Sequence, residues 1–445
     1  MPWRTVMGRV LSGRGARLGG ILLGALLSAC PGALGVERTE DALGIQPPRE
    51  GLALALWQLI QRNPAVQGKR EEVMAQSFQV RSAQARWLPR LGVSAASVDN
   101  GGLDGQASLR LEQPVWSFGK LSGGVSVAKA QLSAEERDLL RVQRELMGEV
   151  IDAYLKIRGL LAEEEVVMVN IREHERLLGH MRRREAGQLA ADADVQLGQS
   201  RLIQAQSQRL RLENDLRGAR AALDALTVLP LPSTPPVPAS LLDLPSMEAL
   251  KATALAEDAE VLYRAALADS AHASARLAKA ELRPDILLRA ETNFIEDPLR
   301  AGAGPRVGLV VQSSLEGLGL VNYRRGQGAE ARAAAAAQDV KFTRAQVDRD
   351  LATLIQRLEL IEALVAAQQE AVASVQTTAE SYLRLYDAGR KSWLDLLNIQ
   401  RELTEQRRGL VQVQAERKQV TLQLALRAGR LDELAKLSVA SPSRP

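Results

Sequence analysis

Polar side chains with the potential for specific contacts lie close to two glycines, Gly187 and Gly389. Lys391 and Asp395 stand four residues apart, which is the spacing of an exposed ion pair on one helix face, worth roughly a few tenths of a kcal/mol. Asp194 follows the first glycine at a position expected to be a helix N-cap. These residues can make polar contacts where helices turn, and nothing in their pattern indicates catalysis.

Patterns typical of enzymes and metal sites are missing from the sequence. His174 and His180 are six residues apart, so they do not share one helix face, and His272 is isolated in another charged stretch. Asp192 and Asp194 lie in an alanine-rich stretch without the features of a cleft. No nucleophile elbow, phosphate loop or metalloprotease motif occurs. The sequence therefore predicts no catalytic residue, no metal ion and no cofactor, and a protein that is not an enzyme.

The composition favours long, closely packed helices. The chain has 445 residues, of which 46% are hydrophobic, 25% charged and only 3% aromatic. Alanine and leucine, mixed with glutamine, arginine and glutamate, are typical of extended helical assemblies. The formal charge is only +4, and Arg4, Arg9, Arg14 and Arg17 supply much of the excess. Since no basic patch with interleaved aromatics occurs, nucleic-acid binding is not expected.

Residues 1–30 have the layout of an export signal. A basic segment precedes the short apolar run Leu18–Leu27, which is too short to span a membrane. The sequence Leu-Ser-Ala-Cys that ends at Cys30 resembles the bacterial lipoprotein box and predicts lipidation of that cysteine. Ordinary cleavage after Gly35 would instead discard Cys30, and Pro31 favours that alternative. Either route takes the chain out of the cytoplasm.

The remainder of the chain is a duplicated pattern. Residues 51–227 and 247–430 form two repeats with the same order of elements, a proline-rich connector at 228–246 separates them, and residues 431–445 form a tail. In each repeat a helix ends before a proline, two alternating segments form a β-hairpin, and a very long helical pattern turns once at a glycine. The hairpins are expected at about 90–115 and 285–314, and the helical turns at Gly187 and Gly389.

These elements predict a mainly α fold with a small β part. Each strand has roughly the 9–11 residues that a tilted strand needs to cross a bilayer. One chain supplies four strands, whereas a closed membrane barrel needs about eight, so the chain must oligomerise if these are membrane strands. The helix expected from Leu121 to Arg184 would be about 100 Å long, which indicates a helical tube rather than a globular domain.

Four motifs recur in a characteristic order, at Leu52–Pro64, Leu88–Leu91, Gln113–Gly119 and Tyr386–Leu397. Their order, spacing and duplication resemble the TolC-like outer-membrane efflux protein family. The resemblance covers nearly all of the chain after the signal. It implies a homotrimer in which a transmembrane β-barrel in outer-membrane lipid continues into an α-helical barrel across the periplasm. It also implies a periplasmic adaptor protein and an inner-membrane transporter, either an ABC transporter or a proton-driven pump.

The resemblance also assigns a gate at the periplasmic end of the tube. The turns at Gly187 and Gly389 would face the adaptor. Lys391 stands where the best-known member has an arginine, and Asn398 stands where it has a pore-facing aspartate. Since lysine lacks the bidentate fork of arginine, weaker closure is expected. The gate positions are Tyr386, Lys391, Asp395, Asn398 and the first-turn partner Asp194.

Two other classes of protein share part of this pattern. A periplasmic adaptor also has a helical hairpin, but adaptors usually carry one hairpin within a β-rich domain rather than two repeats. A structural coiled-coil envelope protein would not need the strand pairs. The sequence does not identify the cargo, because small-molecule efflux and one-step protein secretion use the same kind of outer channel.

Overall fold

The computed structural model describes residue 48 and residues 51–99, 103–295, 305–313 and 316–436. The expected export signal at residues 1–30, with Cys30, lies outside the described residues, as does most of the expected tail beyond residue 436. All of the described residues belong to one compact unit.

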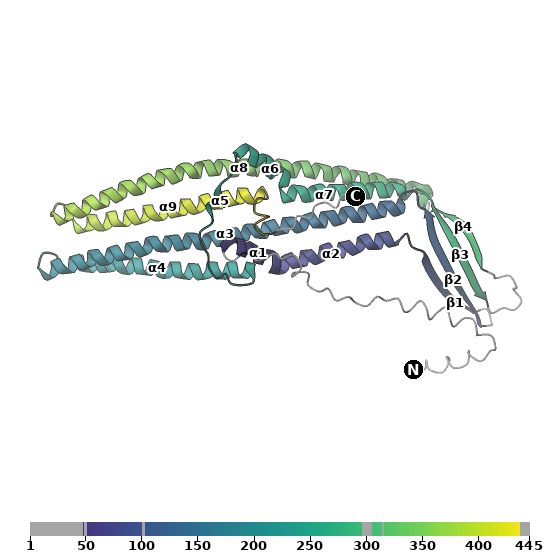
Figure 1. The fold of residues 1–445 in the computed structure, drawn as a ribbon, viewed down its shortest axis with the longest axis horizontal. Helices are drawn as coiled ribbons and strands as arrows, with labels where there is room; N and C mark the ends of the chain where they lie inside the picture. The colour runs from purple at the N-terminus through teal and green to yellow at the C-terminus, as the bar shows by residue number, and fades with distance from the viewer. Residues whose placement is uncertain (1–47, 49–50, 100–102, 296–304, 314–315, 437–445) are drawn as a thin grey trace, which may run out of the picture. The chain divides into compact units, whose positions relative to one another are not determined.

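The first half of this unit contains four helices and two strands. The short helix α1 is followed by α2, the β1–β2 hairpin, the very long helix α3 and then α4 (Figure 1). Asn63 caps α2, because its side chain accepts a hydrogen bond from the Ala65 amide at 2.9 Å. The bounds are α1 Gly51–Arg62, α2 Pro64–Ala85, β1 Arg90–Asp99, β2 Leu103–Trp116, α3 Lys120–Ala186 and α4 Asp192–Thr227.

The second half repeats this order after the connector. The helices α6 and α7 precede the β3–β4 hairpin, and the long helix α8 is followed by α9. Asp258 caps α7 by accepting hydrogen bonds from two backbone amides. The bounds are α5 Ala239–Leu242, α6 Met247–Glu257, α7 Ala259–Ala280, β3 Asp285–Ile295, β4 Arg306–Gln312, η2 Glu316–Gly319, α8 Leu320–Asp387 and α9 Trp393–Arg427.

The two longest helices extend from the sheet to the far turns. α3 has 67 residues and α8 has 68, and neither contains proline, so each can run without a break for about 100 Å. α2 and α7 lie along the parts of α3 and α8 next to the sheet, whereas α4 and α9 lie along the parts that end in the turns (Figure 1). The two helical hairpins are therefore α3–α4 and α8–α9.

A single four-stranded antiparallel sheet joins the two halves at one end of the long helices (Figure 1). The order is β1-β2-β3-β4, so the halves meet where β2 pairs with β3. A bulge between Pro114 and Trp116 shifts the register of that pairing at its base. In the described residues β1 and β4 each have one neighbour in the sheet, which leaves their outer edges unpaired.

A hydrophobic core lies where α1 crosses the middle of the long helices. Leu56 packs with Met147 and Tyr154 of α3 and with Leu422 of α9. The Tyr154 hydroxyl donates a 2.6 Å hydrogen bond to the Pro235 carbonyl, which attaches the connector to the helices. This cluster holds both repeats together away from the sheet.

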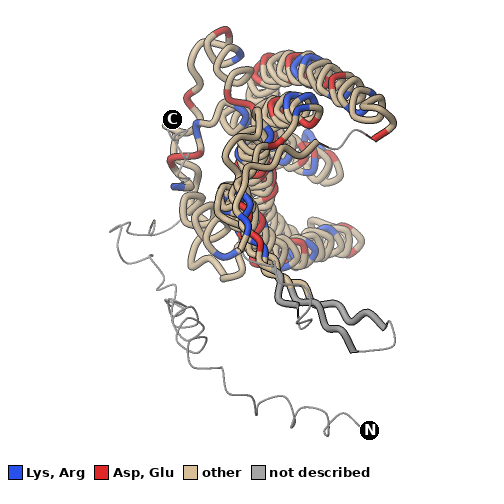
Figure 2. The backbone as a smooth tube through the Cα atoms, turned by 90° about the vertical axis from the view of Figure 1, so that its right-hand side faces the viewer, with Lys and Arg blue, Asp and Glu red and all other residues tan. Residues whose placement is uncertain are grey.

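Charged residues of both signs are interspersed along the helices. Figure 2, which looks at the unit from the end that carries the sheet, shows blue and red segments mixed rather than gathered on one element. Within the described residues, no helix combines the length and the apolar composition that a bilayer crossing requires.

Candidate functional site: the paired helical turns and the two-faced sheet

The two helical turns share one backbone hydrogen-bond pattern. In the second, the Arg390 amide donates to the Leu385 carbonyl at 2.8 Å, and Gly389 is left-handed with φ of 71°. In the first, the Leu189 amide donates to the Arg184 carbonyl at 2.8 Å. Here Gln188 is left-handed, with φ of 54°. Gln188 therefore occupies the place that Gly389 has in the second turn.

The second turn is closed by a capping box at the start of α9. The Asp395 amide donates to Ser392 Oγ at 3.1 Å, and the Ser392 amide donates back to Asp395 Oδ2 at 3.2 Å. The Ser392 hydroxyl, which donates to Asp395 Oδ2 at 2.8 Å, and the Ser392 amide hold the pKa of Asp395 below its usual value, and the charge of Lys391 adds to the effect. Among the ion pairs of the described residues, none joins Lys391 to Asp395. Instead, Lys391 Nζ lies 4.3 Å from the centre of the Tyr382 ring.

The first turn lacks a capping side chain. The N-cap of α4 is Ala191, which offers no side-chain oxygen. The expectation that Asp194 is the N-cap is wrong, because the Asp194 amide donates to the Ala191 carbonyl from within the first helical turn. Asp194 thus holds the position in α4 that Asp395 holds in α9, without a serine partner.

Trp393 connects the two turns. Its Nε1 donates a 3.0 Å hydrogen bond to the Asp194 carbonyl, and its ring is buried. Gly198 of α4 lies beneath the ring, where an added Cβ would come within 3.2 Å of Trp393 Cζ2. Trp393 is not among the site residues predicted from the sequence. The glycine in the interior of α4 was the available signal of a close approach.

Tyr386 is a packed residue within this chain. Its hydroxyl lies 3.9 Å from the sulfur of Met181, and the Arg184 guanidinium lies 5.2 Å from its ring centre. Its ring also meets those of His180 and Trp393 at centroid distances of 6.2 and 5.8 Å. Burial raises the pKa of Tyr386, so the phenol stays neutral.

The five expected gate residues are only partly brought together. Tyr386 and the backbone of Asp194 both contact Trp393. Asp395 and Asn398 are one turn apart on α9, and neither is buried in the chain.

His174 is buried, and burial lowers its pKa. No group of histidine, cysteine or acidic residues in the described part of the chain is arranged to hold a metal ion.

The sheet has two chemically different faces. Directly opposed residues of an antiparallel pair point to the same side. The register places an exposed apolar set on one face, and its pairs include Val93 with Leu109 and Leu288 with Leu309. On the opposite face, Arg110 binds Glu291 at 3.2 Å and Arg289 binds Glu112 at 2.8 Å.

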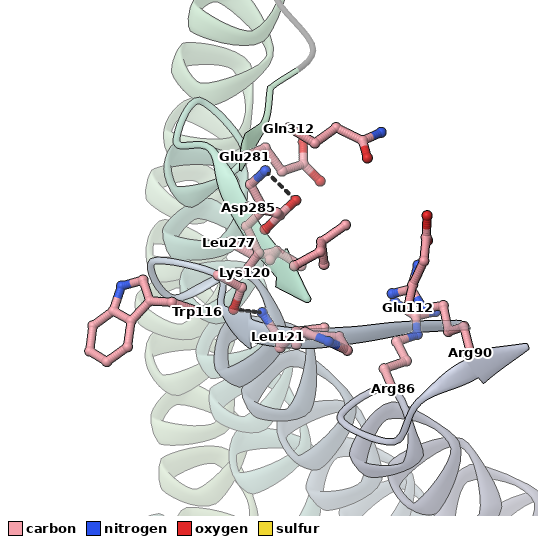
Figure 3. Close-up of a pocket in the computed structure, with 14 residues that line it drawn as sticks. Arg86, Arg90, Glu112, Trp116, Lys120, Leu121, Leu277, Glu281, Asp285 and Gln312 are labelled. Carbon is pink, nitrogen blue, oxygen red and sulfur yellow. Dashed lines mark hydrogen bonds and ion pairs between the residues drawn. The ribbon is translucent and has the colours of Figure 1, made fainter. Parts of the chain in front are cut away.

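A cavity of about 630 Å³ lies at the base of the polar face, between the sheet and the helices α2, α3 and α7. Lys120 Nζ and Asp285 Oδ2 form an ion pair of 2.9 Å there, and Arg86 and Arg90 also line the cavity (Figure 3). Trp116 points away from the other labelled side chains (Figure 3). The polar face therefore continues into the helical region.

The chain thus combines two long helical hairpins with a four-stranded sheet at one end of them. Residues 55–227 match the family described as outer membrane efflux protein. This match, together with solved structures of the same fold, confirms the resemblance to TolC-like channels. The predicted fold class, mainly helical with four strands, is also confirmed. The matched family is one of outer-membrane efflux proteins rather than of enzymes.

Solved structures of outer-membrane channels share the fold over most of the chain. The outer membrane protein VceC from Vibrio cholerae is 18% identical, with a TM-score of 0.73 over 85% of this chain and 96% of its own. CusC is 17% identical, with a TM-score of 0.73 over 84% and 91%. The open state of the MtrE outer membrane channel from Neisseria gonorrhoeae is 16% identical, with a TM-score of 0.70 over 86% and 89%. No curated protein matches the chain in sequence.

Proposed function

We propose that the chain is one subunit of a trimeric outer-membrane channel that exports small molecules or proteins in a tripartite efflux or type I secretion system. The observation that carries this proposal is the sheet, which has an exposed apolar face, a polar face with ion pairs and two unpaired edges. An apolar exterior and a polar interior are the pattern of a barrel wall in lipid.

Oligomerisation follows from the same sheet. Unpaired edge groups are not tolerated in the hydrocarbon region, so β1 of one copy must pair with β4 of the next. Three copies of the four strands give twelve, above the minimum of about eight for a closed barrel. The helical hairpins would then form a second, α-helical barrel in the periplasm.

The remaining assignments complete this proposal. The segment 1–30 directs export, and Cys30 is lipidated. Two structural repeats, 51–227 and 247–430, flank the connector. The turns next to Gly187 and Gly389 contact a periplasmic adaptor, which links the channel to an ABC transporter or a proton-driven pump. The duplicated order of elements supports the repeats, and the position of both turns far from the sheet supports the adaptor contact.

A disulfide between copies tests the assembly. Leu91 and Val311 lie at the bases of the two edge strands, on the same face but on opposite edges of one sheet. The pair Leu91→Cys and Val311→Cys should therefore cross-link copies into a covalent trimer on a denaturing gel. Leu91→Cys with Val307→Cys, at the other end of β4, is the matched control. A cross-link in the control alone, or none in either, would contradict the barrel.

Conductance across a planar bilayer tests the channel itself. The purified full chain should form a trimer that dissociates only on heating and should open ion-conducting pores. Recovery of the chain as a periplasmic monomer without pores would favour an adaptor. Recovery of an elongated oligomer that never enters vesicles would favour a structural envelope protein.

The gate assignment has its own test. We propose that Asp395 and Asn398 face the pore, and that Tyr386, Lys391 and Asp194 hold the closing contacts. The exposed side of α9 that carries Asp395 and Asn398 supports this assignment. Asp395→Ala should lower cation selectivity, and Asn398→Asp should raise it. Ser392→Ala removes the cap but keeps the charge, so it should leave selectivity unchanged. Equal selectivity in all variants would exclude a pore-facing Asp395.

A further inference from the structure

We propose that the two turns leading from the sheet into the long helices are anchors in the headgroup region of the membrane, with Phe118 and Leu318 as their apolar tips. The inference rests on the proposed membrane-spanning sheet and adds a lipid contact to it. Each turn combines an unfavourable backbone conformation with an exposed apolar side chain, and one such turn precedes each of the long helices α3 and α8.

Leu318 has a strained backbone conformation, although its side chain is fully exposed. Its φ is 58°, in the left-handed region that disfavours a branched side chain, and its neighbours Gly317 and Gly319 are also left-handed. The side chain is 99% exposed. Packing within the chain therefore does not explain why leucine stands where glycine or asparagine would be less strained.

Phe118 repeats this arrangement in the first half. Its φ is 48°, and the next residue, Gly119, is left-handed and precedes α3 as Gly319 precedes α8. The Phe118 side chain is 38% exposed. An apolar residue followed by a left-handed glycine thus precedes both long helices. This repetition indicates that an apolar side chain is needed where the sheet meets the helices.

The first turn continues the apolar face of the sheet. Trp116 pairs in register with Ile286, which pairs with Val311 on that face. Trp116 is 59% exposed, and its ring meets Phe118 edge-on at 6.0 Å. Trp116 is among the residues that line the polar cavity, but its ring points away from the other labelled side chains (Figure 3). The aromatic pair therefore lies where the apolar face ends and the helices begin.

Two features indicate that these turns contact the headgroup boundary of a phospholipid bilayer. Tryptophan and other aromatic side chains favour that boundary, since they combine apolar area with a polar or polarisable edge. The exposed Arg283 donates from Nη1 to the Phe118 carbonyl at 3.1 Å, which places a guanidinium beside the aromatic pair and within reach of a lipid phosphate. Trp87 and Leu88 add exposed apolar area nearby, because Gln113 of β2 donates to the Trp87 carbonyl at 2.9 Å.

Spin labels on single introduced cysteines test the inference in the full-length trimer, reconstituted in vesicles of phosphatidylethanolamine and phosphatidylglycerol. Leu318→Cys and Phe118→Cys report on the turns, and Leu309→Cys on the apolar face reports on the sheet. Ser108→Cys, on the polar face, is the matched control, and the unsubstituted chain corrects for any label on Cys30. The measurement is the collision rate of each label with oxygen, which enriches in lipid, and with a water-soluble nickel chelate.

We expect labels at 318 and 118 to give oxygen-to-nickel ratios between those of Leu309→Cys and Ser108→Cys. If Leu309→Cys shows lipid access while both turn labels behave like Ser108→Cys, the anchor is wrong and the membrane-spanning sheet stands. If Leu309→Cys also behaves like Ser108→Cys, the proposed membrane location fails as well. A second variant, Leu318→Asn, accepts the left-handed backbone and should keep the melting temperature in detergent. It should also lower the fraction of trimer that inserts into vesicles, and unchanged insertion would overturn the anchor.

Discussion

The two helical turns have the same backbone pattern but differ in how well their own side chains stabilise it. The second turn has glycine at the left-handed position and a serine–aspartate capping box. The first has Gln188 at the left-handed position and Ala191 at the N-cap. Asp194 is in place to complete a box, yet no serine faces it.

From this difference we infer that the first turn depends on the second. The hydrogen bond from Trp393 to the Asp194 carbonyl joins α9 to the start of α4, and the rings of Tyr386 and Trp393 fill the space between the hairpins. The well-capped α9 therefore supplies a fixed position for the tryptophan that holds the weaker turn. In the proposed channel, displacement of α9 would release the first turn without any change in its own residues.

The largest effect is expected at Trp393. Trp393→Ala removes a buried aromatic side chain and should destabilise the turn region by about 3–5 kcal/mol. Hydrogen exchange of the amides at 187–195 should accelerate more than exchange at 388–392, because the capping box remains. Trp393→Phe, which keeps most of the packing and loses only the hydrogen bond, should cost about 1 kcal/mol. Equal acceleration at both turns would contradict the dependence of the first turn on the second.

A cap exchange should reverse the asymmetry between the turns. Ser392→Ala should destabilise the start of α9 by about 1 kcal/mol, because Asp395 loses its partner. Ala191→Ser should stabilise the start of α4 by a similar amount, about 1 kcal/mol, since Asp194 already occupies the matching position. Amide exchange in the first turn of each helix measures both effects. If Ala191→Ser gives no added protection, the equivalence of Asp194 and Asp395 is wrong.

A smaller change is expected from the left-handed residues. Gln188→Gly should stabilise the first turn by about 0.5–1 kcal/mol, and Gly389→Ala should destabilise the second by about 1 kcal/mol. Thermal melting of the detergent-solubilised trimer can be compared with that of Gly187→Ala. Because Gly187 has a negative φ of −86°, that substitution should be nearly neutral. If Gly187→Ala lowered the melting temperature as much as Gly389→Ala, the assignment of the left-handed position to residue 188 in the first turn would be wrong.

The smallest effect is the pH dependence of the capping box. The pKa of Asp395 is lowered in the folded state, so its contribution is complete above the ordinary aspartate value of roughly 3.9. It is lost as the pH falls through the lower folded value. Protection of the α9 amides should therefore decline only in acid, and Asp395→Asn should remove that decline. A decline near neutral pH would implicate a different group.

Spacing and pattern were enough to predict much of the fold. Proline after each short helix, alternation in the strands and a glycine in each long helical stretch are local signals, and each acts within a few residues of the bond it determines. They indicated the hairpins near Arg90 and Asp285 and the long helices before Gly187 and Gly389, where the structure has them.

The contacts of the candidate site were harder to predict from the sequence. Lys391 and Asp395 have the spacing of an ion pair, but Ser392 offered the carboxylate two closer donors and the Tyr382 ring attracted the lysine. The gate assignments came from a family resemblance, and the one contact that bridges the turns, Trp393 to Asp194, joins residues 199 positions apart. No local pattern reports a contact between such distant residues.

The sequence by itself determined the elements: mainly helix, four short strands, two repeats and a turn near each of two glycines. Only the tertiary structure decided which turn residues are left-handed, which turn depends on the other, and which apolar side chains stay exposed at the base of the sheet. The physical reason is that secondary structure follows from neighbours along the chain. A register between strands, or the meeting of two helical turns, depends on how complete helices pack.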